Sequence, residues 1–157
     1  MKEMNIVPRL YILIGVPGSG KSTWAKDFGE SAFTLVIISP DDIRASLGDV
    51  MDQSKNAEVW ELAYDAVVDN LDRGWDVILD ATAATLYTRK KSIEVGHSMN
   101  AEVIGVYFPV SAELAKERNK GRERVVPEHV IDRMIATLNL HPPHLGEGFN
   151  DLYTVED

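Results

Sequence analysis

Residues 15–22 read G-V-P-G-S-G-K-S, and this octapeptide constrains the fold more than any other segment of the chain. It fits the phosphate-binding loop pattern G-x-x-x-x-G-K-[ST] at every fixed position. The apolar residues 10–14 precede it and are typical of a buried parallel strand, and residues 23–28 continue it as a helix. A strand, a glycine-rich turn and a helix in this order predict a site for a nucleoside triphosphate. An accidental glycine-rich turn is the alternative, which the complete match disfavours.

The residues of this loop have separate expected roles. Its backbone N–H groups point at phosphate oxygens, and the positive end of the following helix faces the same anion. Lys21 is expected to reach the β- and γ-phosphates, and Ser22 to bind Mg²⁺ through its hydroxyl. The predicted nucleotide-binding residues of the loop are Gly15, Pro17, Gly18, Ser19, Gly20, Lys21, Ser22 and Thr23.

Composition and charge limit the class of protein. A length of 157 residues suggests one domain that spans residues 1–157, and no apolar run approaches the roughly 20 residues of a membrane span. The absence of cysteine excludes disulfides and cysteine-ligated metals. Residues 1–5 lack the pattern of a signal peptide, so we expect a cytoplasmic protein without a membrane partner. The net charge of −9 argues against broad binding along nucleic acid, but not against a local grip on a few phosphates.

Apolar strand candidates alternate with helical patterns along the chain. The expected strands are residues 10–14, 35–38, 77–79, 103–108 and 149–155, and the expected helices are residues 21–28, 41–47, 54–73, 85–98, 112–119 and 128–138. This alternation predicts an α/β fold with a parallel sheet and helices on both faces. In such sheets ligands bind at the carboxyl ends of the strands, so we expect the site in the segments that follow the strands.

Two aspartates follow the second expected strand, in the segment S-P-D-D-I-R of residues 39–44. A carboxylate there lies near the γ-phosphate and is suited to accept the proton of an attacking hydroxyl. Arg44 comes three residues after Asp41, so on a helix it would orient this carboxylate or hold an acceptor phosphate. Helix capping by Ser39 or Asp41 explains the same spacing equally well.

Asp80 ends the apolar run of the third expected strand. In phosphate-loop proteins an acid at this place holds Mg²⁺ directly or through water, whereas the alternative is an ordinary turn residue. The phosphate loop at the same edge of the sheet favours the metal role, so Ser22 and Asp80 form the predicted magnesium site. Thr82 or Thr85 is interpreted as a cap of the next helix, and residues 89–91, R-K-K, as its solvated face.

A cluster of basic residues lies between the last two expected helices. It holds five of the sixteen basic residues of the chain, namely Lys116, Arg118, Lys120, Arg122 and Arg124. With Gly121 as a hinge, this segment is predicted to be a basic lid that closes over the triphosphate, with Arg118 and Arg122 on the phosphates. A solvated turn with ion pairs to Glu117 and Glu123 is the alternative, which the local concentration of charge disfavours.

With these motifs the chain resembles the 5′-hydroxyl polynucleotide kinases of the phage type, within a larger group of small P-loop kinases that includes zeta-toxin-like proteins. The resemblance covers residues 10–140. It rests on G-V-P-G-S-G-K-S-T-W-A at 15–25, S-P-D-D-I-R at 39–44, V-I-L-D-A-T at 77–82, R-N-K-G-R at 118–122 and V-P-E-H-V at 126–130. No D-x-D-G-T motif is present, so the phosphatase activity of bifunctional relatives is not expected.

The resemblance implies roles for single residues. Asp41 corresponds to the general base, and Arg44 to the arginine that contacts this base and the 3′-phosphate of the acceptor. Arg122 corresponds to the lid arginine on the donor phosphates, and Lys21 to the lysine of the phosphate loop. Asp80 corresponds to the strand-end aspartate, although D-A-T stands here where relatives often have D-x-N. The predicted catalytic residues are therefore Lys21, Asp41, Arg44 and Arg122.

We therefore expect an ATP- and Mg²⁺-dependent kinase that phosphorylates the 5′-hydroxyl of a DNA or RNA end. ATP is favoured over GTP because no N-K-x-D stretch occurs. One alternative is a kinase that acts on a hydroxyl of a small molecule, a nucleotide sugar or a modified base, which the acidic charge favours. A second is an ATP-binding module without transfer activity, which the presence of both Asp41 and Asp80 disfavours. No residue indicates an oligomeric state.

Overall fold

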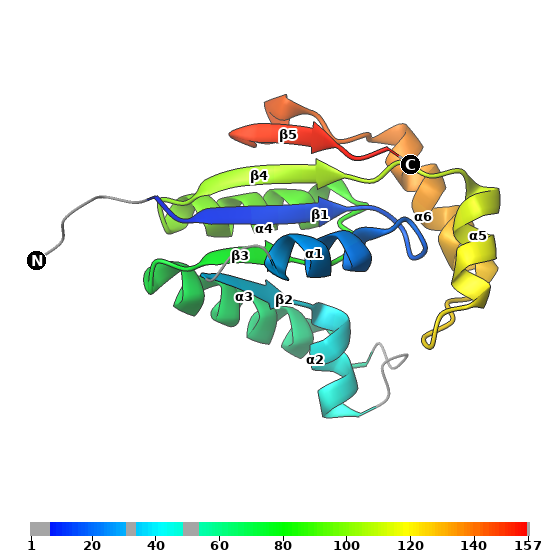
Figure 1. Ribbon diagram of the computed structural model, residues 1–157, viewed down its shortest axis with the longest axis horizontal. Helices are drawn as coiled ribbons and strands as arrows, with labels where there is room; N and C mark the ends of the chain where they lie inside the picture. The colour runs from blue at the N-terminus through cyan, green and yellow to red at the C-terminus, as the bar shows by residue number, and fades with distance from the viewer. Residues whose placement is uncertain (1–6, 31–33, 49–53, 157) are drawn as a thin grey trace, which may run out of the picture.

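A parallel sheet forms the centre of the computed structural model, which describes residues 7–30, 34–48 and 54–156. Within these ranges the sheet has five strands in the order β2-β3-β1-β4-β5 (Figure 1). The strands are β1 (Arg9–Ile14), β2 (Leu35–Ile38), β3 (Asp76–Leu79), β4 (Glu102–Tyr107) and β5 (Asp151–Thr154). The expectation that no signal peptide is present concerns residues 1–5, which lie outside the described ranges.

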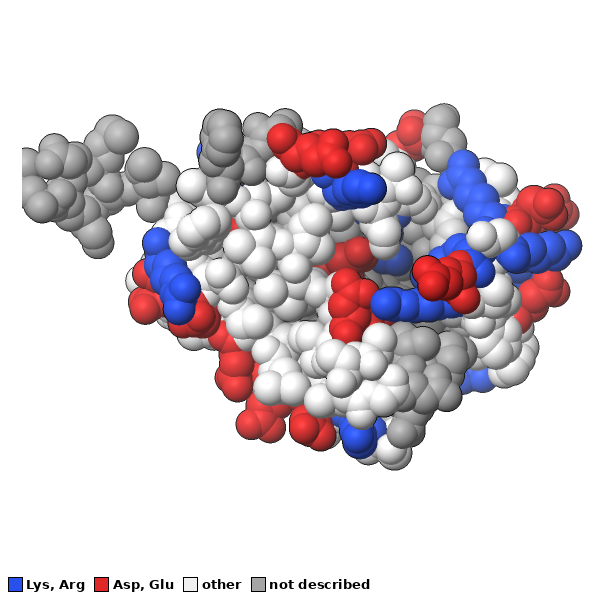
Figure 2. All heavy atoms as spheres, turned by 60° about the horizontal axis from the view of Figure 1, so that its bottom comes forward, with Lys and Arg blue, Asp and Glu red and all other residues white. Residues whose placement is uncertain are grey.

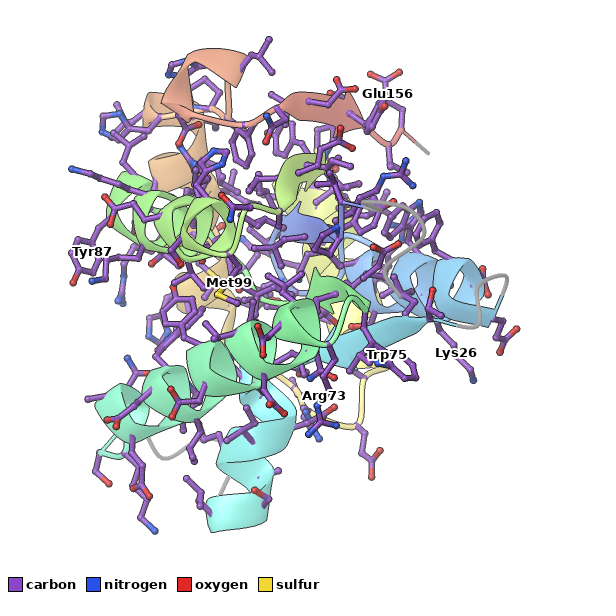
Figure 3. All side chains as sticks on the ribbon, turned by 90° about the vertical axis from the view of Figure 1, so that its left-hand side faces the viewer. Lys26, Arg73, Trp75, Tyr87, Met99 and Glu156 are labelled. Atoms are coloured by element: carbon purple, nitrogen blue, oxygen red, sulfur yellow. The ribbon has the colours of Figure 1, made fainter. Side chains whose placement is uncertain are left out.

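Helices cover both faces of this sheet. They are α1 (Lys21–Glu30), α2 (Pro40–Leu47), α3 (Asn56–Asp72), α4 (Leu86–Ser98), α5 (Ala112–Lys120) and α6 (Glu128–Leu140), with a 3₁₀ turn at Leu145–Glu147. Figure 3 shows α3 and α4 on one side of the sheet and α1 on the other. The predicted α/β fold is therefore confirmed, and each expected element ends within two residues of its observed bounds. In the described part of the chain no helix is both long and apolar enough to cross a bilayer.

The side chains of β1 alternate between two apolar cores. Leu10 is fully buried in the core that contains Val67 of α3 and Ile93 of α4, whereas Leu13 is buried on the other face with Ala25 of α1. Burial of a large apolar side chain contributes about 1.5–3 kcal/mol. The two cores therefore hold α1 against the sheet with its first residues beside the end of β1.

The segments that follow the strands meet at one edge of the sheet, on the right in Figure 1. They are the phosphate loop after β1, the start of α2 after β2, the loop after β3, and α5 after β4. A hydrogen bond of 3.0 Å joins two of them, because the Gly15 N–H group donates to the Thr82 carbonyl oxygen. The parallel direction of the strands thus gathers segments that are far apart in the sequence.

The interpretation of residues 89–91 as a solvated helix face is wrong for Arg89. The Arg89 side chain is completely buried, whereas Lys90 and Lys91 are exposed. Arg89 lies one helical turn before the buried Ile93, so it belongs to the face of α4 that packs on the sheet. The proposed cap of this helix is confirmed, since the Thr85 hydroxyl accepts a hydrogen bond of 3.1 Å from the Thr88 N–H group.

Candidate active site

The phosphate loop has a backbone that only glycine adopts without strain at two positions. Gly18 has φ of 86° and Gly20 has φ of 98°, in the left-handed region. Gly18 also lies against α5, because a Cβ atom built on it would come within 2.5 Å of the Ala115 carbonyl oxygen. The loop therefore passes directly beside the helix that leads into the basic segment. Its position at the N-terminus of α1 suits a bound phosphate group.

Lys21 extends beneath this loop, with its Nζ atom 3.5 Å from the Val16 carbonyl oxygen. Burial lowers the pKa of Lys21 below its ordinary value of 10.5, and the positive charge of Arg122 lowers it further. Asp80 and Asp41 act in the opposite direction, because their negative charges stabilise the ammonium group. The site thus holds two cations that repel each other when no anion lies between them.

We expect nucleotide binding to weaken at alkaline pH because of this lowered pKa. The ammonium form of Lys21 attracts phosphates. The affinity for nucleotide is therefore highest at pH values below the pKa of Lys21 in the nucleotide-free protein, and it falls as the pH rises through that pKa. Dissociation constants of a fluorescent ATP analogue from neutral pH to about pH 10 measure this decline. In Lys21→Arg the guanidinium stays charged, so the profile should be flat over the same range. An equally flat wild-type profile would contradict the lowered pKa of Lys21.

Ser22 and Asp80 lie together, as the predicted magnesium site requires. The Ser22 hydroxyl donates a hydrogen bond of 2.9 Å to Oδ2 of Asp80, and the Asp80 N–H group is held by the Ile38 carbonyl oxygen at 2.9 Å. A hydroxyl and a carboxylate are hard oxygen ligands that suit Mg²⁺. No cluster of three or more potential metal-binding side chains exists among the described residues, so water and phosphate oxygens would complete the coordination.

The start of α2 presents Asp41 to the same region. Ser39 is the N-cap, since its hydroxyl accepts a hydrogen bond from the Asp42 N–H group at 3.2 Å, so Asp41 is not needed as a cap. Nη1 of Arg44 donates to Oδ1 of Asp41 at 2.6 Å, and Nη2 donates to Oδ1 of Asn56 at 2.7 Å. The Arg44 side chain is only 9% exposed and the Asp41 side chain 56% exposed. Arg44 therefore lies behind Asp41 and orients it.

The basic segment after α5 faces the phosphate loop and α2. Nη1 of Arg118 donates to the Gly18 carbonyl oxygen at 3.3 Å. Nη1 of Arg122 is buried and has no hydrogen-bond partner among the residues that the structure describes. Arg124 makes an ion pair of 2.9 Å with Asp42. The segment thus spans the site, and Arg122 carries an N–H group that an anion would satisfy.

Two cavities meet at this edge of the sheet, where Figure 2 shows acidic and basic side chains around a hollow. The first, of about 210 Å³, is lined by Pro17, Gly18, Gly20, Lys21, Ser22, Thr23, Arg118 and Arg122. The second, of about 280 Å³, is lined by Pro17, Lys21, Ser22, Ala25, Ile37, Ser39, Asp41, Asp42, Asp80, Ala81, Thr82, Arg122 and Arg124. Pro17, Lys21, Ser22 and Arg122 line both, so these residues form the boundary between the two cavities.

One residue and one contact of this site were missed in the sequence. Asn56, which holds Arg44 from the start of α3, was not singled out. Asp42 and Arg124 belong to the predicted aspartate pair and basic lid, but the ion pair by which they join α2 to the basic segment was not predicted. Arg44 is absent from the lining of both cavities, although the resemblance implies that it contacts the acceptor. A further cavity of about 490 Å³ lies between α1 and β5, against Trp24 and Tyr153, and contains none of the predicted site residues.

Comparisons with known proteins give a consistent classification. The model of a family described as AAA_33, AAA domain, matches residues 10–141. A curated relative, the L-seryl-tRNA(Sec) kinase of Methanococcus maripaludis, is 25% identical over 138 residues, which are 80% of this chain and 50% of the relative. The chain therefore spans about half the length of that protein.

Solved structures share the fold. A chain in the structure of the Pnkp1/Rnl/Hen1 RNA repair complex has a TM-score of 0.76 and 25% identity, over 88% of this chain and 46% of that one. A putative kinase from Chloroflexus aurantiacus has a TM-score of 0.69 and 22% identity, over 96% and 88% of the two chains. A gluconokinase from Sinorhizobium meliloti has a TM-score of 0.62 and 19% identity, over 95% and 82%.

Proposed function

Because the chain belongs to the AAA_33 family of AAA domains, we propose that it is an ATP- and Mg²⁺-dependent kinase that phosphorylates the 5′-hydroxyl of a DNA or RNA end. The observation that carries the proposal is the boundary between the two cavities. Lys21, Ser22 and Arg122 stand between the cavity of the phosphate loop and the cavity of Asp41. A phosphoryl group that passes from one cavity to the other would meet these three side chains throughout its transfer.

The residues then have the following chemical roles. The hydroxyl oxygen of the acceptor attacks the γ-phosphorus, its bond to phosphorus forms, the bond to the bridging oxygen of ADP breaks, and Asp41 takes the hydroxyl proton. Arg44 holds Asp41 in place during this step. Lys21 and Arg122 neutralise the charge on the transferring group. When bound between Ser22 and Asp80, Mg²⁺ would supply further neutralisation of the β- and γ-phosphate oxygens.

Two observations support a nucleic-acid acceptor. The relatives at 25% identity are named as a kinase of L-seryl-tRNA(Sec) and as a component of an RNA repair complex. Arg124 adds a positive charge to the cavity of Asp41, within a chain whose net charge is −9. A small-molecule acceptor is the second candidate. The three carboxylates of Asp41, Asp42 and Asp80 offset the three basic side chains that line the same cavity, so the cavity offers a polyanion no excess of positive charge.

A labelling experiment tests the proposal. The protein is incubated with γ-labelled ATP, Mg²⁺ and a short oligonucleotide that ends in a 5′-hydroxyl, beside the same strand already 5′-phosphorylated. Label on the 5′-hydroxyl strand alone is the expected result. If ATP binds but neither strand is labelled, while a small hydroxyl compound stimulates ADP release, the second candidate replaces the first. If ATP binds but no acceptor stimulates turnover, the remaining hypothesis is an ATP-binding module without transfer activity.

We expect Arg124→Gln to weaken binding of the acceptor and to leave binding of the nucleotide unchanged. Arg124 lines the cavity of Asp41 but not the cavity of the phosphate loop. Loss of one charged hydrogen bond costs about 1.5–3 kcal/mol, so the KM of the acceptor should rise by about tenfold or more. The KM of ATP should stay unchanged in the same kinetic assay. Arg73→Gln, which removes an exposed arginine from an ion pair with Asp69 on α3, is the matched control.

A further inference from the structure

Among the described residues, Arg89 is the largest side chain that is completely buried. Its guanidinium donates hydrogen bonds from Nη1 to the Ala83 and Ala84 carbonyl oxygens at 3.2 and 3.0 Å. Nη2 donates to the His141 carbonyl oxygen at 2.7 Å, and Nε donates to Oε1 of Glu147 at 2.8 Å. Tyr87, two residues earlier on α4, points outward and is 72% exposed (Figure 3). Because all three guanidinium nitrogens of this buried charge donate hydrogen bonds, we infer that Arg89 has a specific structural role.

The carbonyl groups that Arg89 binds belong to the loop that follows Asp80. This loop is held at Asp80 by the end of β2, and in its middle by the hydrogen bond from Gly15 to Thr82. Ala83 has φ of 50°, a left-handed conformation that is costly for alanine. Such strain persists only where the surroundings enforce it. Arg89 provides the enforcing contact on the C-terminal side of the strained position, because it fixes the carbonyl groups of Ala83 and Ala84. The Gly15 N–H group holds the Thr82 carbonyl on the N-terminal side.

Glu147 secures Arg89 from a distant part of the chain. Its side chain is only 8% exposed and is the counter-charge of the buried guanidinium. The second oxygen of Glu147 accepts a hydrogen bond from the His144 N–H group at 3.0 Å, and His97 of α4 contacts the Gly148 carbonyl oxygen at 2.7 Å. The segment of residues 141–148 is therefore attached to α4 at two places, Arg89 and His97.

We propose that Arg89, paired with Glu147, is a positioning residue for Asp80. The guanidinium maintains the strained turn at Ala83, the turn places the Thr82 carbonyl against the phosphate loop, and the loop then holds Asp80 beside Ser22. Residues 141–148 thereby contribute to the magnesium site without touching the nucleotide. This inference rests on the metal role in the proposed function, but not on the identity of the acceptor.

The test compares nucleotide binding with and without magnesium. In Arg89→Lys the ammonium still faces Glu147 but cannot reach all of the carbonyl groups at once, because it lacks the planar fork of arginine. A fluorescent ATP analogue is titrated in Mg²⁺ and in EDTA. We expect the affinity of Arg89→Lys for the analogue in EDTA to equal the wild-type value. The factor by which Mg²⁺ raises this affinity should fall about tenfold, the size of effect seen when residues that hydrogen-bond to metal ligands are replaced. Lys91→Gln, an exposed charge on the same helix, is the control that should match the wild type.

A rescue separates positioning from general damage. Ala83→Gly removes the cost of the left-handed conformation, so in the Arg89→Lys background it should restore most of the strengthening by Mg²⁺. If Arg89→Lys melts below the assay temperature, the variant with both Arg89→Met and Glu147→Leu takes its place. If a folded variant keeps the full wild-type effect of Mg²⁺ on affinity, the positioning role of Arg89 is overturned, but the metal role of Ser22 and Asp80 is not. A wild-type protein that binds the analogue equally well in Mg²⁺ and EDTA overturns the metal role, and this inference with it.

Discussion

Asp41→Asn should lower the turnover number by about 10²–10⁴-fold, the range that a positioned general base contributes. Asparagine keeps the oxygen that accepts the hydrogen bond of 2.6 Å from Arg44, so the geometry at the start of α2 should persist. The amide has no basicity, so the acceptor hydroxyl would keep its proton while the oxygen attacks. ATP binding should be unchanged, because Asp41 does not line the cavity of the phosphate loop. Steady-state kinetics and calorimetric titration with ATP measure the two effects separately.

The matched control for this variant is Asp69→Asn. Asp69 is also a helical aspartate paired with an arginine, at 3.3 Å from Arg73, but it is 62% exposed and lies on α3 away from both cavities. Its kinetics should equal those of the wild type. Wild-type turnover in Asp41→Asn would remove the assigned base role. Loss of ATP affinity in that variant would instead make Asp41 part of the nucleotide site.

Much of the fold could be predicted from the sequence because its signals are local. The apolar run before the phosphate loop and the turn glycines mark β1 and α1, and the predicted resemblance to small P-loop kinases agrees with the family that the chain matches. The proximity of Ser22 and Asp80 could be predicted as well, because the carboxyl ends of parallel strands meet at one edge. Asp80 comes directly after β3, and Ser22 lies in the first turn of α1, after the phosphate loop that follows β1.

The contacts that the sequence analysis missed join residues that local patterns do not relate. The Arg89–Glu147 pair joins residues 58 positions apart, and Arg124 meets Asp42 across the site. One signal was nevertheless available for Arg89. Helical spacing places it four residues before Ile93, on the buried stripe of α4, whereas Lys90 and Lys91 fall outside that stripe. Charge alone grouped these three residues, and helical periodicity separates them.

Glu147→Ala should destabilise the protein by about 3–5 kcal/mol, because it leaves the buried charge of Arg89 without a counter-charge. That loss is a large part of the 5–15 kcal/mol by which a domain is typically stable. Arg89→Ala should cost at least as much, since it also leaves the carbonyl oxygens of Ala83, Ala84 and His141 without this donor. Chemical denaturation, followed by circular dichroism, measures both changes in the free energy of unfolding.

The variant with both Arg89→Met and Glu147→Leu distinguishes charge from packing in this prediction. It removes the two buried charges together and leaves only the carbonyl oxygens unsatisfied, so its loss of stability should be smaller than the sum of the two single losses. The exposed pair of Arg73 and Asp69 is the reference, where either substitution by alanine should cost about 1 kcal/mol or less. Additive losses at Arg89 and Glu147 would show that each residue stabilises the core independently. The segment of residues 141–148 would then be attached to α4 by packing rather than by the ion pair.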